Sequence, residues 1–392
     1  MKSTLLKSIL ATSLLCSFGA LNAADWAYDA ANLENNTKDS LELTNTSYSI
    51  DTSEGELTIL GGIKMASSPV TVTGAYALNV NGQINNTFNS LTLDNANLNA
   101  AGGLSFFYDS TSLTSVGTSK LTLSSQKAVF SSSANLVVSE GSNLTVAGNN
   151  LEFNNSNITL GNNAVLNADK VDIFFNTNIT LGDNAILNAN AVSVMYGGTK
   201  NISLGKNSKL IHSGTGRMEN ISSLTMQEGS SIYMGGYAHL SGSVTLNNLG
   251  ANAVSSGIEL YGDEGLVIDI SLGNNSLECL DASSAMIKTT YAKTMLGEIN
   301  ISLDDFILSE DFVKGETYTI ALLYGQQALP EEWLNSITNI ENSTFAQYVE
   351  GSLTQDGRLI SLQIQAVPEP SSYAAIFAAA ALALAALRRR KI

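Results

Sequence analysis

The chain has 392 residues, a formal charge of −16, 32 glycines, two cysteines and two histidines. Charged residues make up 14% of it, against ~25% in an ordinary soluble domain, and 40 asparagines supply much of the polar share. Such a surface is not one for nucleic acid, because phosphate neutralisation needs clustered lysines and arginines. Two cysteines also exclude a disulfide scaffold and a multi-cysteine metal site.

Residues 1–23 have the parts of a secretory signal peptide. Lys2 and Lys7 supply the positive start, residues 8–21 are apolar, and small residues follow. The sequence therefore predicts export through the Sec translocon. A short lead-in over 24–39 precedes the body of the protein.

A repeat of about 22 residues occupies 40–275. Residues 157–167 and 178–188 share the pattern Asn-Ile-Thr-Leu-Gly, and 201–210 differ from it by one Ser for Thr. The first apolar position of each period falls at 91, 113, 136, 158, 179, 202 and 224, with steps of 22, 23, 22, 21, 23 and 22. Each period holds three short runs in which apolar and polar residues alternate, which is the pattern of β-strands.

Strands this short cannot each build a core, and no helical segment is present in the repeat to cover them. Coiling three strands per period and stacking the coils at ~4.8 Å buries the alternate apolar side chains in a central column. We therefore predict an all-β fold, a parallel β-helix over 40–275. A β-sandwich array fits less well, because sandwich strands are longer and less evenly spaced. Asn157, Asn178 and Asn201 are expected to adopt left-handed turn conformations and to stack as an amide ladder.

Residues 276–366 are predicted to form a β-rich C-terminal cap, because the ends of a β-helix expose strand edges that need cover. A proline and two glutamates at its start predict a helix over 330–337. Residues 352–364 are predicted to form a hairpin with Asp356-Gly357 at the turn. The repeat and this cap together resemble the passenger domains of autotransporters.

The C-terminus has three parts in a fixed order. Val367-Pro368-Glu369-Pro370 comes first, an apolar run from Tyr373 to Leu387 follows, and Arg388-Arg389-Arg390-Lys391 comes last. The run has 15 residues, at the short edge of the ~17–25 that span a bilayer. The basic tetrad predicts a transmembrane helix with its tail in the cytoplasm and the body outside.

These three parts resemble the PEP-CTERM sorting signal of Gram-negative bacteria, over residues 367–392. The resemblance implies an exosortase, a membrane enzyme that recognises Pro368-Glu369-Pro370 and cuts near it. It also implies an exported protein associated with the envelope and with extracellular polysaccharide. The protein would be anchored in the membrane until processing and then retained in the envelope or released.

Polysaccharide lyases and glycoside hydrolases also use β-helices, and they need clustered carboxylates. The best local group is Asp169-Lys170-Val171-Asp172, with Asp183 one coil further on. Alternation places Lys170 and Asp172 on the outer face, where solvated strand-edge charge is the favoured interpretation.

The rarest reactive residues indicate no catalytic centre. His212 and His239 are 27 residues apart, more than one coil, so surface or turn positions are expected for both. Loss of the signal peptide removes Cys16 and leaves Cys279, which is expected to be a small buried residue. No catalytic residue, metal site or cofactor is predicted.

A row of hydroxyls is predicted on the outer face of the first strand of each coil. Its members are Thr92, Thr114, Thr159, Thr180, Ser203, Thr225 and Thr245, with Val137 interrupting. A row at ~4.8 Å spacing suits hydrogen bonding to a surface glycan or other repeating polymer, or to ordered water as in ice-binding solenoids. Threonine is also a favoured outward residue of any strand.

The leading hypothesis is an exported, exosortase-sorted structural or adhesive protein of the cell envelope or extracellular space, without catalytic activity. The alternative is a polysaccharide-active β-helix enzyme, a lyase or a glycoside hydrolase. Ice binding is the third and weakest hypothesis.

Overall fold

The computed structural model of the chain describes residues 26–29, 37–44, 47–86, 89–108, 111–191, 198–214, 217–235, 237–260, 267–292, 298–303, 316–325, 338–341 and 349–366, with 306, 313, 328, 378–379 and 381–382. It divides into two compact units. The first comprises 1–178 and 187–190, and the second comprises 179–186 and 191–392.

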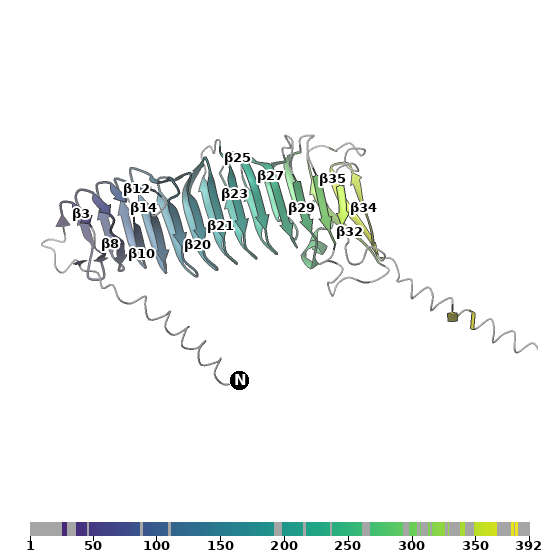
Figure 1. Cartoon of the computed structure of the whole chain (residues 1–392), viewed down its shortest axis with the longest axis horizontal. Coiled ribbons are helices and arrows are strands. Elements are labelled where there is room, and N and C mark those ends of the chain that lie inside the picture. The colour runs from purple at the N-terminus through teal and green to yellow at the C-terminus, as the bar shows by residue number, and fades with distance from the viewer. Residues whose placement is uncertain are drawn as a thin grey trace, which may run out of the picture. The chain divides into compact units, whose positions relative to one another are not determined.

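The first unit is a parallel β-solenoid, which confirms the all-β, parallel β-helix part of the predicted fold (Figure 1). Three short strands make each turn, and each pairs in parallel with the strand one turn on. The strands therefore form three columns.

The first column contains β1 (Trp26–Asp29), β4 (Tyr48–Asp51), β7 (Val70–Thr73), β10 (Ser90–Asp94), β13 (Ser112–Val116), β16 (Asn135–Val138) and β19 (Asn157–Leu160). The second contains β2 (Thr37–Lys38), β5 (Leu57–Ile59), β8 (Ala77–Val80), β11 (Asn97–Ala100), β14 (Thr118–Leu123), β17 (Asn143–Gly148) and the start of β20 (Val165–Phe174). The third contains β3 (Leu41–Thr44), β6 (Ile63–Ala66), β9 (Ile84–Asn86), β12 (Leu104–Phe107), β15 (Ala128–Ser131), β18 (Leu151–Asn154) and the end of β20.

The core of this unit consists of the inward side chains of the three columns. Burial alternates along the strands, as in β7 and β10, because successive side chains point to opposite faces. In the third column Phe106, Phe130 and Phe153 are fully buried register partners. Their rings stack with centroids 4.8 Å apart at both contacts, which is the spacing of the turns themselves.

Asparagine has two separate uses in the turns and strands. Asn157 lies within β19 and accepts at its amide oxygen from Asn178 (2.8 Å) while it donates to Asn135 (2.9 Å), so the predicted ladder is confirmed for Asn157 and Asn178. The expectation that these same residues take the left-handed conformation is wrong. That role belongs to Asn155 and Asn163, at φ 48° and 57°.

The second unit continues the parallel pattern. Its first column runs through β23 (Lys200–Leu204), the ends of β25 (Arg217–Met226) and β27 (Tyr237–Asn247), β29 (Val267–Ser271), β31 (Glu298–Ser302) and β33 (Thr338–Glu341). Its second column runs through β24 (Lys209–His212), β26 (Ser231–Met234) and the starts of β28 (Val254–Leu260) and β30 (Ile287–Ala292) to β32 (Thr317–Tyr324). The starts of β25 and β27 and the ends of β28 and β30 form its third column. β21 (Thr177–Leu181) and β22 (Ile186–Ala191) lie where the two units divide.

The last described strands of this unit pair in antiparallel fashion. A short 3-10 helix, η2 (Asn274–Glu278), follows β29. β35 (Leu359–Ala366) lies between β32 and β34 (Val349–Asp356) and pairs with both. The predicted hairpin is confirmed, but its two-residue loop is Gly357 and Arg358, one residue later than expected. Gly357 has φ 56°, which suits the turn that connects tightly paired strands.

Several predicted segments lie outside the described residues: the signal peptide over 1–23, the helix over 330–337, the Pro-Glu-Pro motif and the basic tail. Four positions of the C-terminal apolar run, 378–379 and 381–382, are helical. Within the described part of the chain, no helix is long and apolar enough to cross a membrane.

Candidate functional site

The predicted hydroxyl row lies on the outer side of the first column. In the first unit Thr71, Thr92, Thr114, Val137 and Thr159 are successive register partners. Thr71 was missed because its period lies before the strongest repeats, although Val70-Thr71-Val72 has the same alternation.

The row has a counterpart in the second unit. Ser203, Thr225 and Thr245 are partners there, and Asp269 follows them. Thr180 lies in β21 and is exposed. In the first unit the hydroxyls are therefore interrupted at Val137, and in the second unit they are followed by the Asp269 carboxylate.

The carboxylates of the third column differ from the sequence prediction. Asp172 was expected to be solvated, but it is only 4% exposed. It lies in register with Glu152 on the preceding turn, and Asn150 donates a hydrogen bond to its carboxylate. Burial of a carboxylate is tolerated only with such partners, so Asp172 has a structural environment that alternation alone does not predict.

Glu152 is held from two sides. Lys127 forms an ion pair with it, and Asn154 donates to its other carboxylate oxygen at 2.8 Å. Its side chain is 14% exposed. Two carboxylates on adjacent turns and one cation thus gather here, and each of these carboxylates accepts at least one hydrogen bond.

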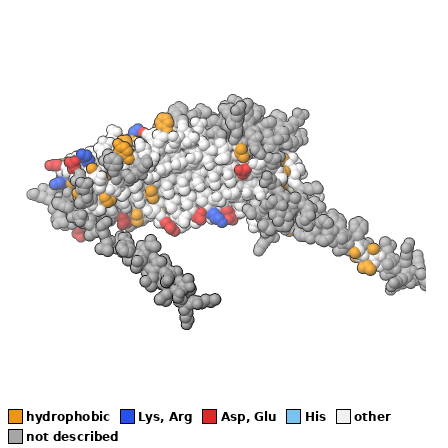
Figure 2. Space-filling model, viewed as in Figure 1, with side chains coloured by type: hydrophobic (Ala, Val, Ile, Leu, Met, Phe, Trp, Pro, Cys, Tyr) orange, Lys and Arg blue, Asp and Glu red, His pale blue; other side chains and the backbone are white. Residues whose placement is uncertain are grey.

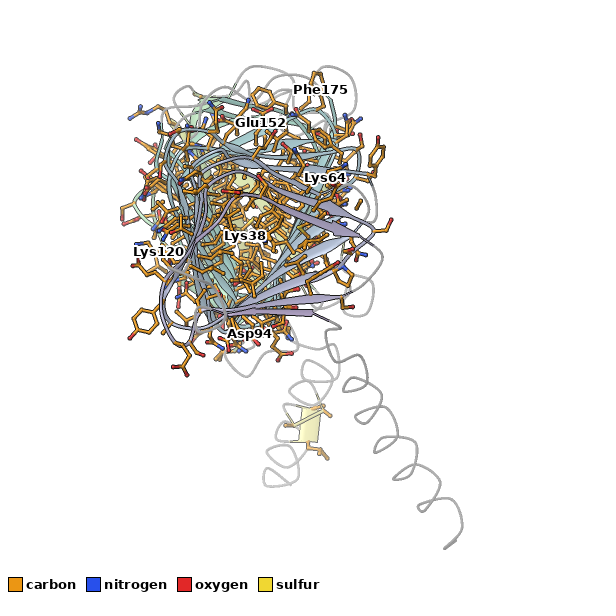
Figure 3. All side chains as sticks on the ribbon, turned by 90° about the vertical axis from the view of Figure 1, so that its left-hand side faces the viewer. Lys38, Lys64, Asp94, Lys120, Glu152 and Phe175 are labelled. Atoms are coloured by element: carbon orange, nitrogen blue, oxygen red, sulfur yellow. The ribbon has the colours of Figure 1, made fainter. Side chains whose placement is uncertain are left out.

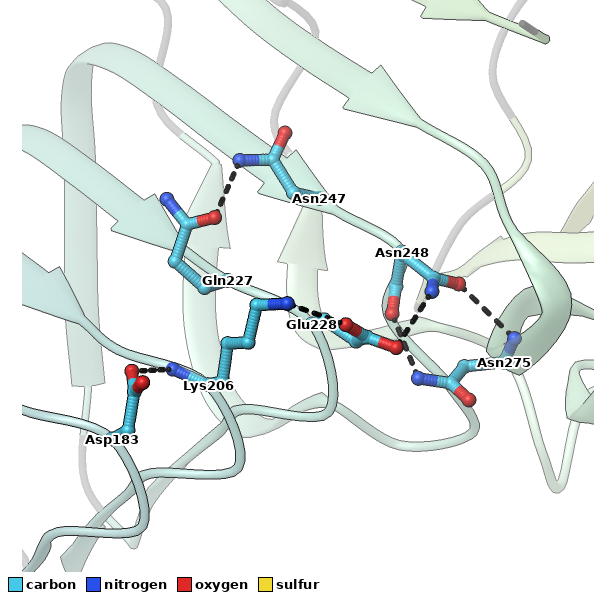
Figure 4. A network of polar contacts seen from close by, with 7 residues as sticks. All are labelled: Asp183, Lys206, Gln227, Glu228, Asn247, Asn248 and Asn275. Atoms are coloured by element: carbon cyan, nitrogen blue, oxygen red, sulfur yellow. Dashed lines mark hydrogen bonds and ion pairs between the residues drawn. The ribbon is translucent and has the colours of Figure 1, made fainter. Parts of the chain in front are cut away.

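A second polar cluster lies at a corner of the second unit, between its first and second columns (Figure 4). Lys206 contacts two carboxylates. Its backbone N–H donates to Asp183 Oδ1 at 2.8 Å, and its ammonium lies 3.1 Å from Glu228 Oε2. Asn248 donates to Glu228 Oε1 at 3.3 Å, and Asn275 donates to Asn248 through its backbone and its amide, both at 3.1 Å. The carboxylate, cation and amide groups of successive turns therefore form one connected network.

The local turn conformation places these side chains. Asn184, Asn207 and Gly229 occupy the same turn position with φ 57°, 54° and 67°. Their backbones form a ladder, in which Asn184 N–H donates to Lys206 O (2.7 Å) and Asn207 N–H donates to Glu228 O (2.8 Å). Asparagine and glycine suit this conformation, which directs the preceding residue of each turn outward.

The network borders a groove of about 510 Å³, which is lined by Lys206, Gln227, Glu228, Asn247, Asn248, Gly273 and Asn274. A groove of about 480 Å³ on the first unit is lined by Ser40, Leu41, Glu42, Gly62, Ile63, Lys64, Gln83 and Asn85. There, Lys64 lies 2.8 Å from Glu42, and its hydrogen bond and charge lower the pKa of that carboxyl. Both grooves offer side-chain amide groups and one ion pair each, and the groove on the first unit also has the Ser40 hydroxyl. Such groups can hydrogen-bond a neutral polar ligand.

Among the histidines and cysteines, the structure describes the side chains of His212 and Cys279, and both are buried. His212 was expected at a surface or turn position, but it is the last residue of β24 and is 4% exposed, and burial lowers its pKa. Neither of its ring nitrogens has a hydrogen-bond partner among the described residues. Cys279 is buried as predicted, and burial, with the nearby Glu278 charge, raises its pKa to about 12.

His239 pairs by backbone with Glu259, and its side chain is not described. Among the residues described, no group of three or more His, Cys, Asp or Glu is placed to hold a metal ion.

The view in Figure 2 shows a surface that is mostly neither hydrophobic nor charged, with charged side chains in small groups. Outward hydroxyls and amides of the described strands, such as Thr92, Thr114 and Asn178, contribute to this character. Such a surface presents many weak hydrogen-bonding groups at the regular spacing of the turns.

Comparison with known proteins identifies the C-terminus. Residues 366–391 match the PEP-CTERM protein-sorting motif. No curated protein and no solved structure matches the chain. The likeness of the body to autotransporter passengers therefore stays a prediction from the sequence.

Proposed function

We propose that this exported protein, which carries a PEP-CTERM sorting motif and a β-solenoid body, is a structural or adhesive component of the cell envelope or the extracellular space. The motif at 366–391 carries the proposal, because it implies recognition and processing by an exosortase. The C-terminal tail directs sorting, and the β-solenoid is the part of the protein that acts after export.

The surface of the solenoid supports an adhesive role. Its turns repeat hydroxyls and amides in register, as in Thr92 and Thr114 or Asn157 and Asn178. A polymer with a regular repeat can form many weak hydrogen bonds to such a surface at once, and their sum gives useful affinity. Extracellular polysaccharide or a surface glycan is the partner class that this chemistry suits.

The sorting half of the proposal has a direct test in the native host. Replacement of Pro368-Glu369-Pro370 by alanines is expected to block processing, so that the full-length chain accumulates in the membrane fraction. Ser371-Ser372 replaced by alanines is the matched control and should be processed normally. Normal processing and release of the Pro-Glu-Pro variant would refute the assignment of the tail.

A polysaccharide-active enzyme is the second candidate, and Glu152 beside Asp172 is the observation that favours it. Glu152 and Asp172 are register partners in adjacent turns, which are ~4.8 Å apart. That spacing is nearer the ~5–5.5 Å between the carboxylates of retaining hydrolases than the ~6.5–9.5 Å of inverting ones. The hydrogen bonds that both groups accept favour a structural role instead.

An assay for sugar products distinguishes the adhesive function from the enzymatic one. The processed protein is incubated with neutral and acidic polysaccharides, and new reducing ends and unsaturated sugars are measured. Activity that disappears in both Glu152→Gln and Asp172→Asn would replace the adhesive proposal with an enzymatic one. No release from any polysaccharide, together with retention of the protein on one of them, is the expected result.

A further inference from the structure

One edge of the first unit carries aromatic side chains in an unusual backbone conformation. This edge is the turn that leads from the third column to the first column of the next coil. Phe107, Ser131, Asn154 and Phe174 are successive register partners at the ends of their strands. The residues that follow them are Tyr108, Ser132, Asn155 and Phe175, and all four have positive φ, at 89°, 54°, 48° and 49°.

The fold does not require aromatic residues there. Asparagine and glycine adopt left-handed backbone conformations readily, whereas bulky side chains are outliers in that region. Asn155 occupies the same turn position as Tyr108 and Phe175, so a residue suited to the turn is available in this chain. Residues kept in a disfavoured conformation point to a use for their side chains.

Burial does not explain the two aromatic residues either. Phe175 is 53% exposed and Tyr108 is 49% exposed, and Phe107 beside Tyr108 is also exposed. Figure 3 shows the Phe175 ring at the periphery of the coils. Both rings therefore present apolar area to solvent at the expense of backbone strain.

The groups between the rings are polar. Tyr108 and Phe175 are separated by three turns, or about 14 Å at the rise of a parallel stack. Ser132 and Asn155 occupy the two turns between them, and Asn176 donates to Asn155 at 3.1 Å. Aromatic faces separated by hydroxyl and amide groups suit a ligand whose own faces are apolar and whose edges carry hydroxyls. A chain of pyranose rings has this character, because its C–H bonds point to the faces and its hydroxyls lie around the ring.

Charge restricts the class of glycan. The chain carries −16, and Glu152 and Asp172 lie on the strands that lead into this edge. A uronate-rich or sulfated polysaccharide would be repelled, and so would a nucleic acid. A neutral polysaccharide meets no such penalty.

We propose that this edge, formed by Tyr108, Ser132, Asn155 and Phe175, binds a neutral polysaccharide chain. Sugar rings stack on Tyr108 and Phe175, and sugar hydroxyls hydrogen-bond to Ser132 and Asn155 between them. The inference rests on the proposed adhesive function and names its site and its ligand class.

The test uses the processed protein purified from its host and native electrophoresis in gels that contain hydroxyethylcellulose, xylan or dextran, with alginate as the acidic comparison. Phe175→Asn and Tyr108→Asn each remove a ring and place a residue that tolerates the turn. Each is expected to weaken retardation by one of the neutral glycans by between about twofold and tenfold. The melting temperature should stay the same or rise, because asparagine relieves the backbone strain, so loss of binding cannot be attributed to misfolding.

Tyr76→Asn is the matched control. Tyr76 is 51% exposed in the same unit but lies between β7 and β8, at a different corner. Its replacement should leave retardation unchanged.

Each of the following outcomes would refute the proposed binding site. Retardation of the wild type that neither edge variant weakens would place the binding elsewhere and leave the adhesive proposal standing. Retardation by none of the neutral glycans would exclude this ligand class, while exosortase processing is measured separately. A change of sedimentation coefficient in the edge variants, without a change in retardation, would show that the edge contacts a second copy of the chain.

Discussion

The stacked rings of Phe106, Phe130 and Phe153 allow a quantitative prediction about the core. Phe130 is fully buried and is stacked on both faces, with ring centroids 4.8 Å apart on each side. An aromatic side chain buries ~150–250 Å², which at ~25 cal/mol per Å² stabilises the folded state by at most ~4–6 kcal/mol. Replacement of a core phenylalanine by alanine costs ~3–5 kcal/mol. We expect Phe130→Ala to lie at the upper end of that range, because two ring contacts disappear.

Phe106→Ala is the matched control. In the described structure Phe106 is also fully buried but stacks on one ring. Because a stacked pair contributes ~0.5–1.5 kcal/mol beyond its buried area, Phe106→Ala should cost less than Phe130→Ala by about that amount. The difference in destabilisation between the two variants gives the contribution of one ring contact, because both variants leave a cavity of similar size.

Amide hydrogen exchange is the suitable measurement, because a solenoid is stabilised by nearest-neighbour contacts and does not unfold as a single unit. Loss of protection should be greatest in β12, β15 and β18 and should decline within a few turns on either side. A cost below ~1 kcal/mol, or an equal loss of protection along the whole unit, would refute the nearest-neighbour reasoning.

Three further predictions concern buried polar groups. Ser115 is buried in the first column with no hydrogen-bond partner for its hydroxyl. Ser115→Ala should therefore raise the local stability of β13 and its neighbouring strands by about 1 kcal/mol in amide hydrogen exchange, and a loss of protection there would contradict this. Burial lowers the pKa of His212, so the unfolded chain takes up a proton at higher pH than the folded one. The stability of the folded protein should therefore be greatest above about pH 6.5 and should fall as the pH drops below that value. His212→Met should reduce this loss of stability between about pH 7.5 and 5.5. Cys279, with its pKa raised to about 12, should react with iodoacetamide at pH 8 only after denaturation, and rapid labelling of the native protein would show that it is accessible.

The repeat made the architecture predictable. A 22-residue period with alternating apolar residues has few solutions, because such strands bury their side chains only by stacking on copies of themselves. The same period predicted the register of Thr92, Thr114 and Thr159 and the amide ladder at Asn157 and Asn178. The sorting motif was recognisable for a different reason, since it is read as a linear segment and needs no fold.

The repeat did not predict which turn residues are left-handed or which outward residues are covered. Asn155 and Asn163 take the left-handed positions, although Asn157 looked equally suitable, because backbone conformation depends on where each strand ends within the coil. Asp172 was expected to be solvated, but it is buried between two buried neighbours in β20, which strand alternation does not predict. His212 was expected at a surface or turn position, but it ends β24 on the same inward face as buried Leu210.

The sequence by itself therefore determined the class of fold, the register of the repeats and the sorting motif, because each of these depends on a local or periodic pattern. The tertiary structure decided which side chains meet. Tyr108 and Phe175 are 67 positions apart in the chain and belong to turns with no common motif. They share an edge only because three successive parallel pairings bring their strands into one column.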